Sequence, residues 1–213
     1  MIAALVLAAG SSNRLGTPKQ LLPVDGRPLV RHVVEAANAS SCDAVAVILG
    51  AHAQRIEGAI GGLDVVMLPN TRWIEGMAAS IRVGVAWADA QDFDAVMIVV
   101  ADQLRITRDH LDALVLAHRE RNVISASKYC GVLGVPAVFP RSAFASLMAL
   151  AGDRGARDVL RASSDDVAEV AWDDGAFDID VPADLSRLTP RRLGSPLERP
   201  VRRTTQRARA RSR

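Results

Sequence analysis

The chain has few cysteines, few aromatic residues and no long apolar run, and each scarcity excludes a class of protein. Its two cysteines, Cys42 and Cys130, form no CxxC pair and have no histidine cluster nearby. This argues against a disulfide framework or a structural zinc site and favours a reducing compartment. No apolar run approaches the roughly 18 residues that span a bilayer. Residues 1–9 lack the preceding basic charge of a signal peptide. We therefore expect a soluble, cytoplasmic protein with no membrane partner.

Lysine is also scarce, and most of the basic charge lies at the C-terminus. Ten arginines and one glutamate between Arg187 and Arg213 give this segment a net charge of +9, whereas the rest of the chain, at −7, brings the total to +2. The pI of 8.8 is a property of that segment, so we expect no specific nucleic-acid partner. Apolar periodicity ends after Leu188, which predicts a disordered tail over residues 189–213. A solvated extension is the simpler interpretation, and binding of polyanions or a partner is the alternative.

Residues 1–188 have the length and apolar content of one α/β domain. Short β-branched runs predict strands at residues 2–7, 44–49, 64–68, 95–100, 123–127 and 136–139, with a last strand ending near Asp180. Helical patterns fall between them at residues 28–39, 77–89, 107–121, 142–150 and 156–161, the third with Thr107 as its N-cap. The run AVMIVV at 95–100 has no polar alternation, which is typical of a central parallel strand buried on both faces. This order predicts a mostly parallel central sheet with ligands at the carboxyl ends of its strands.

The loop after the first predicted strand carries the first chemical signal, LAAGSSNRLGTPK from Leu7 to Lys19. Its small residues allow backbone N–H groups to approach an anion, and Arg14 and Lys19 add positive charge. The loop is neither GxGxxG nor a Walker A motif, because Gly10 and Gly16 have no third partner and Lys19 does not directly follow Gly16. It predicts an anion site of another type, and a small-residue turn with surface charges is the alternative.

Several segments together resemble one enzyme family. LAAGSSNRLGTPKQLL resembles the nucleotidyltransferase signature LAAGxSxRxGxxKxLL. Further matching segments follow in order: N-x-x-W-x-x-G-M-x-x-S at 70–80, Asp-Gln at 102–103, G-x-P at 134–136, GDRGAR at 152–157 and DIDVP at 178–182. Over about residues 2–188 the chain is similar to MobA-like NTP transferases, and most to molybdenum cofactor cytidylyltransferases. The resemblance implies a three-layer nucleotide-binding fold like that of nucleotide-diphospho-sugar transferases, and Mg²⁺-dependent nucleotidyl transfer.

Three aspartates are candidates for holding the metal. Asp102 closes the most apolar strand, where a carboxylate suits a hard cation, with turn formation or helix capping as the alternative. The resemblance implies that Asp102 binds metal, although Leu104 stands where the family usually has proline. Asp178 and Asp180 would face the same side of an extended segment, so either could complete the site. We favour Asp180, whose alternative role is to cap a helix starting at Pro182.

The resemblance also implies which residues hold the nucleotide. They are Leu7, Ala8, Ala9, Gly10, Ser11, Ser12, Lys19, Asn70, Gly76 and Ser80. Ala9 favours CTP, because cytidylyl members read LAAG whereas guanylyl relatives read LAGG. Trp73 is interpreted as a packing residue rather than a platform for the base.

The later half of the chain would hold a phosphorylated pterin as second substrate. Its candidate contacts are Gly134, Pro136, Asp153, Arg154 and Arg157. The two arginines could clamp a terminal phosphate, because guanidinium groups suit bidentate phosphate contacts. Arg157 could equally be an ordinary cation on a helix surface. Val135 replaces the polar residue that cytidylyltransferases often carry before this proline.

The implied reaction is attack of the pterin phosphate on the α-phosphorus of CTP, assisted by Arg14, Lys19 and the Mg²⁺ at Asp102. A phosphate monoester is already anionic and needs no general base. One alternative is transfer to another phosphorylated acceptor. A second is a non-catalytic protein that delivers cofactor to a molybdenum hydroxylase, although the intact Lys19 and Asp102 argue against it. A third, a pterin- or flavin-linked oxidoreductase, lacks a dinucleotide fingerprint. The four histidines receive no role.

Overall fold

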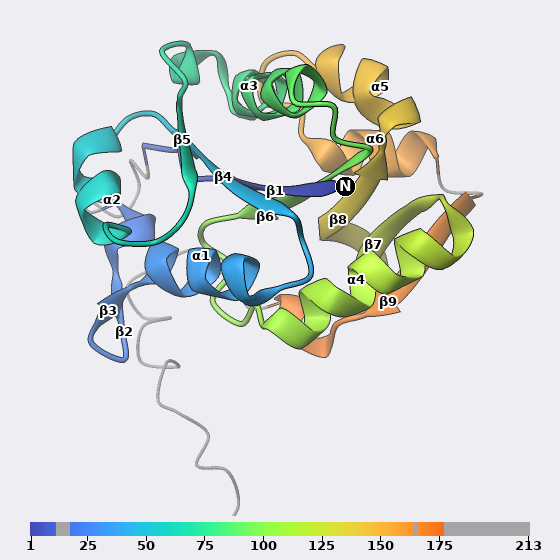
Figure 1. Ribbon diagram of the computed structural model, residues 1–213, viewed down its shortest axis with the longest axis horizontal. Coiled ribbons are helices and arrows are strands. Elements are labelled where there is room, and N and C mark those ends of the chain that lie inside the picture. Colours follow the sequence, from blue (N-terminus) through green and yellow to red (C-terminus); the bar gives the residue numbers. More distant parts are fainter. Residues whose placement is uncertain (12–17, 164–165, 177–213) are drawn as a thin grey trace, which may run out of the picture.

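A mixed β-sheet forms the centre of the protein (Figure 1). The computed structural model describes residues 1–11, 18–163 and 166–176. Within these residues the sheet has seven strands in the order β5-β4-β1-β6-β8-β7-β9. Their bounds are β1 (Ile2–Leu7), β4 (Ala44–Leu49), β5 (Val66–Pro69), β6 (Ala95–Val100), β7 (Ile124–Tyr129), β8 (Val132–Pro140) and β9 (Val167–Ala171). Only β8 runs antiparallel to its neighbours β6 and β7 among these strands, so the predicted mostly parallel sheet is confirmed.

The central strand β1 lies between β4 and β6, with Leu5 paired to Ala46 on one side and Ile98 on the other. Alternate residues of β1 enter two separate apolar clusters, one on each face of the sheet. Because both faces are covered, β6 is buried from Ala95 to Val99, as its unbroken apolar run predicts.

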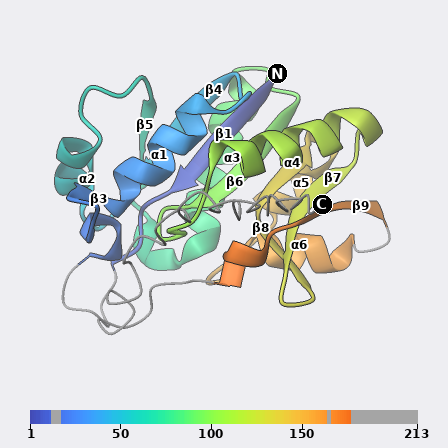
Figure 2. The same ribbon diagram turned by 90° about the horizontal axis from the view of Figure 1, so that it is seen from below.

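Helices cover both faces of the sheet, which gives the expected three layers. One face carries α1 (Leu29–Ala39) and α4 (Arg108–Arg121), which lie side by side across the strands in Figure 2. The opposite face carries α3 (Met77–Ala90), α5 (Phe144–Met148) and α6 (Ala156–Ala162) (Figure 1). No helix in the described parts of the chain is long and apolar enough to cross a bilayer.

Most predicted elements are present, with shifts at their ends. The hydroxyl of Thr107 accepts a hydrogen bond from the backbone N–H of His110 at 3.3 Å, so the predicted N-cap of α4 is confirmed. The predicted helix over residues 142–150 is shorter, since a 3₁₀ turn at Arg141–Ala143 precedes α5. The short elements α2 (Ala53–Ala59) and β9 were not predicted from the sequence. The strand expected near Asp180 lies outside the described residues.

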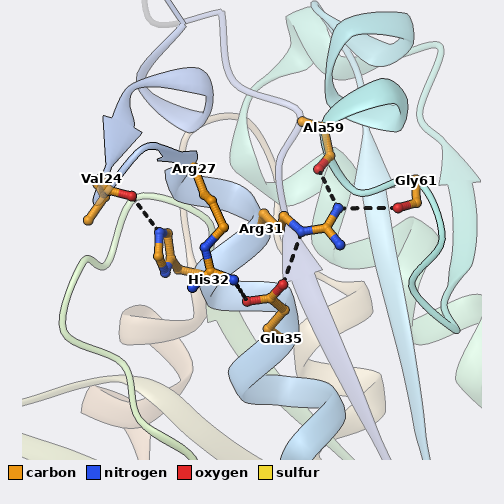
Figure 3. Close-up of polar contacts among 7 residues, drawn as sticks. All are labelled: Val24, Arg27, Arg31, His32, Glu35, Ala59 and Gly61. Atoms are coloured by element: carbon orange, nitrogen blue, oxygen red, sulfur yellow. Dashed lines mark hydrogen bonds and ion pairs between the residues drawn. The ribbon is translucent and has the colours of Figure 1, made fainter.

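A small hairpin of β2 (Pro23–Val24) and β3 (Arg27–Pro28) leads into α1 (Figure 3). Nε2 of His32, on α1, donates a hydrogen bond to the Val24 carbonyl at 2.7 Å. His32, which has no role in the sequence analysis, therefore ties the hairpin to the helix.

A second set of bonds ties α1 to its other neighbour, α2. The Glu35 carboxylate accepts from Arg27 at 2.8 Å and from Arg31 at 3.0 Å (Figure 3). Nη1 of Arg31 also donates to the carbonyls of Ala59 and Gly61, at 3.1 and 3.2 Å. The β2–β3 hairpin and the end of α2 are thereby fixed to one helix.

Candidate functional site

A cavity of about 1010 Å³ opens at the carboxyl ends of β1 and β6. Leu7 and Val100, the last residues of these strands, are paired in the parallel register. The loop after β1 and the turn after β6 therefore leave the sheet side by side and form one wall. The predicted site residues that line the cavity are Leu7, Ala9, Gly10, Ser11, Lys19, Gly76, Ser80, Asp102, Asp153 and Arg157.

Two polar side chains donate hydrogen bonds to backbone carbonyl groups of the small-residue loop after β1. Nε2 of the buried Gln20 donates to the Gly10 carbonyl at 2.9 Å. His52 Nε2 donates to the Ser11 carbonyl at 3.2 Å. Both bonds fix loop carbonyl groups against the protein body. Neither residue was predicted from the sequence, in which Gln20 stands between Lys19 and Leu21 and no apolar pattern marks it.

Gly50, also missed, allows a close approach of three segments. A β-carbon on Gly50 would lie 2.6 Å from the Ala9 carbonyl oxygen and 2.8 Å from the β-carbon of Trp73. The end of β4 thus packs directly on the loop and on Trp73. Trp73 both lines the cavity and packs against the apolar cluster beside α3, so its interpretation as a packing residue stays a prediction.

Asn70 and Ser80 form a buried pair beside the cavity. Asn70 is 3% exposed, does not line the cavity, and donates through Nδ2 to the Ser80 hydroxyl at 3.0 Å. Its Oδ1 accepts from the backbone N–H of Arg72 at 3.0 Å. Asn70 therefore orients Ser80, and Ser80 is the member of the pair that reaches the cavity.

Segments from the two halves of the chain meet at Gly76. Its φ is +98°, and a β-carbon there would lie 2.5 Å from Oδ1 of Asp153 and from the Gly152 carbonyl oxygen. The Ala78 N–H donates to the Gly152 carbonyl at 3.1 Å. The predicted nucleotide segment at 70–80 and the predicted second-substrate segment at 152–157 therefore form one continuous wall.

Asp102 and Lys19 are both half-buried and line the cavity. The backbone N–H of Ala101, next to Asp102, donates to the Leu7 carbonyl at 3.1 Å, so this turn is bonded to the end of β1. Among the described residues no group of three or more His, Cys, Asp or Glu side chains is placed to hold a metal. Mg²⁺ is commonly bound through one or two carboxylates and substrate phosphates, and Asp102 beside an anion loop fits that donor set. Ser12, Arg14, Asp178 and Asp180 lie outside the described residues.

The predicted contacts in β8 are arranged differently from the expectation. Gly134 and Pro136 do not line the cavity, whereas Val135 between them does. A β-carbon on Gly134 would lie 2.3 Å from the hydroxyl oxygen of Tyr129, so this glycine makes room for a tyrosine that the sequence analysis missed. The Val135 carbonyl accepts a hydrogen bond from Gln103 Nε2 at 2.7 Å, which joins β8 to the turn that carries Asp102.

Comparisons with known proteins place the chain in one family. A family model described as "MobA-like NTP transferase domain" matches residues 4–167. Purine catabolism protein PucB of Bacillus subtilis (strain 168) is 30% identical over 199 residues, which cover 85% of this chain and 93% of that protein. Nicotine blue oxidoreductase of Paenarthrobacter nicotinovorans is 32% identical over 171 residues, covering 75% and 81%.

Solved structures agree with this family. Rv0371c from Mycobacterium tuberculosis H37Rv is 31% identical, with a TM-score of 0.72 over 88% of this chain and 96% of that one. The same protein has been solved in complex with manganese, with a TM-score of 0.70, 27% identity and coverage of 88% and 97%. CMP:2-keto-3-deoxy-manno-octonic acid synthetase, solved with CTP, shares the fold alone, at 15% identity and a TM-score of 0.68 over 88% and 96% of the two chains.

Proposed function

The chain belongs to the MobA-like NTP transferase family and is a nucleotidyltransferase, and on this premise we propose that it transfers CMP from CTP to the terminal phosphate of molybdopterin. The observation that carries the proposal is the shared cavity. Lys19, Asp102 and residues 9–11 of the small-residue loop line it, together with Arg157 from the later half. One cavity thus offers groups suited to a nucleoside triphosphate and to a phosphorylated acceptor. The transferase domain would span residues 1–188 and work in the cytoplasm, with residues 189–213 as a separate tail.

A divalent cation, Mg²⁺ in our proposal, would be held by Asp102 with Asp180, or with Asp178 in its place. The manganese complex of Rv0371c supports a divalent ion in a relative. When bound, such an ion neutralises charge on the phosphate oxygens.

The residues of the chain would bind and align two anionic substrates. An oxygen of the acceptor phosphate forms a new bond to the α-phosphorus of CTP, the bond to the β-phosphate oxygen breaks, and pyrophosphate leaves. The attacking oxygen carries no proton, so no side chain has to remove one. Lys19, with Arg14, would contact the phosphate oxygens as charge develops on the leaving group. Removing the Lys19 charge should slow transfer by about 10²–10³-fold.

The proposal of CTP as donor rests on Ala9. Ala9 is buried, lines the cavity and lies against Gly50. It occupies the position at which cytidylyl members of the family have alanine and guanylyl relatives have glycine.

Another phosphorylated acceptor, such as a sugar or polyol phosphate, is the second candidate. The observation that favours it is Val135, which presents an apolar side chain to the cavity where cytidylyltransferases often have a polar one. A molybdenum hydroxylase would be the partner that receives the product only if the pterin is the acceptor.

The test is to incubate the protein with Mg²⁺, each of the four nucleotides and molybdopterin, and to follow pyrophosphate release. We expect release with CTP and molybdopterin together, and none when either is omitted. Release with a sugar phosphate in place of molybdopterin would select the second candidate. Absence of release with every combination would contradict the transferase proposal and favour a delivery protein.

A further inference from the structure

Arg157 differs from its basic neighbours on and around α6. Nε of Arg154 lies 3.9 Å from one oxygen of Asp158, and Nη1 of Arg161 lies 3.7 Å from the other. Arg157 lines the cavity, and no carboxylate in the described parts of the chain lies within ion-pair distance of it. Its charge is therefore available to an anion in the cavity, whereas those of Arg154 and Arg161 are partly balanced by Asp158.

The guanidinium group of Arg157 is held by a single aromatic side chain. Its Nη2 donates a hydrogen bond to the hydroxyl of Tyr129, and its central carbon lies 5.6 Å from the centre of the Tyr129 ring. The second distance is that of a cation–π contact. Arginine is long and loses much rotamer freedom when it binds a ligand, so two contacts made in advance reduce that loss.

Tyr129 is itself fixed in place. It is 8% exposed, and its ring packs edge-on against Trp172 at 5.7 Å. Its hydroxyl fills the space left by Gly134 and lies 3.5 Å from the Val135 carbonyl, to which it donates. The hydroxyl therefore accepts from Arg157 while it donates to β8, and the tyrosine cannot turn away without losing both bonds.

We infer that Tyr129 is a positioning residue, which holds the Arg157 guanidinium at the cavity wall to bind an anionic group of the acceptor. The inference rests on the proposed function in that the acceptor carries a phosphate. Arginine has five N–H donors, and Tyr129 takes one, so the rest can form a bidentate contact with phosphate oxygens. The Val135 carbonyl, which also accepts from Gln103, links this arrangement to the turn that carries Asp102.

The test uses inorganic phosphate as the probe, titrated by calorimetry into the full chain with CTP and Mg²⁺ already in excess. We expect Tyr129→Phe, which keeps the ring, to weaken phosphate binding by about three- to tenfold, the effect of one hydrogen bond. Arg157→Gln should weaken it at least as much. In the double variant the loss should equal that of Arg157→Gln alone, because Tyr129 acts through Arg157. Arg119→Gln, on α4 and outside the cavity lining, is the matched control and should change little.

Gly134→Ala gives a second approach that leaves the tyrosine in place. The added methyl group must displace the hydroxyl of Tyr129, so phosphate affinity should fall as it does in Tyr129→Phe. When Gly134→Ala is added to the Arg157→Gln variant, it should cause no further loss of affinity. A purely structural role for Tyr129 would instead lower the melting temperature without changing phosphate affinity. Additive losses in the double variant, an unchanged affinity in Tyr129→Phe, or no phosphate binding to the wild type would each overturn the inference.

Steady-state kinetics separate this inference from the proposed function. If molybdopterin is the acceptor, Tyr129→Phe should raise its KM about three- to tenfold and leave the KM for CTP unchanged. If molybdopterin is not used, but the phosphate affinities behave as described, the choice of acceptor is wrong and the role of Tyr129 stands.

Discussion

Gly76 and Asp153 approach so closely that no side chain larger than hydrogen fits between them. A β-carbon on Gly76 would lie 2.5 Å from Oδ1 of Asp153, and the φ of +98° at Gly76 is one that other residues rarely adopt. This contact joins the segment before α3 to the segment before α6. This part of the cavity wall therefore requires a glycine at position 76.

Gly76→Ala should lower the free energy of unfolding by about 1–3 kcal/mol, because the new methyl group adds a clash to backbone strain. It should also weaken nucleotide-dependent stabilisation, since the wall is displaced. Thermal and urea unfolding, with and without CTP and Mg²⁺, measure both effects. Gly58→Ala, on α2 with no atom within 4 Å of the new carbon, is the control and should be neutral or slightly stabilising. Equal behaviour of the two variants would show that the close approach at Gly76 has no energetic importance.

CTP with Mg²⁺ should raise the melting temperature more than GTP or ATP does at the same concentration. A ligand that binds only the folded state stabilises it according to its concentration relative to Kd, so the tightest nucleotide gives the largest shift. Differential scanning fluorimetry with the four nucleotides measures this. Equal shifts for all of them would count against Ala9 as the residue that selects cytidine.

The stability of the protein should fall as the pH is lowered from about 6.5 to about 4 through the behaviour of His110. Burial lowers the pKa of His110 from 6.5 to about 4, and the ring stacks on Trp172 at 4.8 Å while Nε2 donates to the Ser127 hydroxyl at 2.8 Å. The unfolded chain binds the proton at a higher pH than the folded one. The stabilisation is therefore complete above pH 6.5 and is lost as the pH falls towards 4.

His110→Phe keeps the stacking on Trp172 and removes the titrating group. Its free energy of unfolding should depend less on pH than that of the wild type over this range, as measured by urea unfolding at several pH values. Identical pH slopes for the two proteins would mean that other groups cause the acid sensitivity.

The parts of the fold with unbroken apolar patterns could be predicted from the sequence, and those fixed by distant contacts could not. The strands at 2–7, 44–49 and 95–100 agree with β1, β4 and β6 because their patterns are local. In contrast, Tyr129 lies in a segment without a recognisable motif, and its proposed role depends on contacts with Gly134 and Arg157. The same reason explains why Gly134 was predicted as a substrate contact: its motif marks the position, but only the structure shows which side chain needs the space.

The site was predictable to a similar degree. The motifs identified Lys19, Asp102 and Ser80, which all line one cavity. They did not separate residues that face the cavity from residues that support those that do. Asn70 belongs to the second group, because it is buried, does not line the cavity and donates to Ser80, which does.

The central claim is that CMP is transferred in the cavity that contains Asp102. Its most direct test is to follow α-labelled CTP into molybdopterin with Mg²⁺, for the wild type and for Asp102→Asn, with Asp109→Asn on α4 as the control. We expect labelled product from the wild type and the control, and a rate at least about 100-fold lower for Asp102→Asn at an unchanged melting temperature, partly restored by higher Mg²⁺. Full activity of Asp102→Asn, or no labelled pterin from the wild type, would contradict the claim.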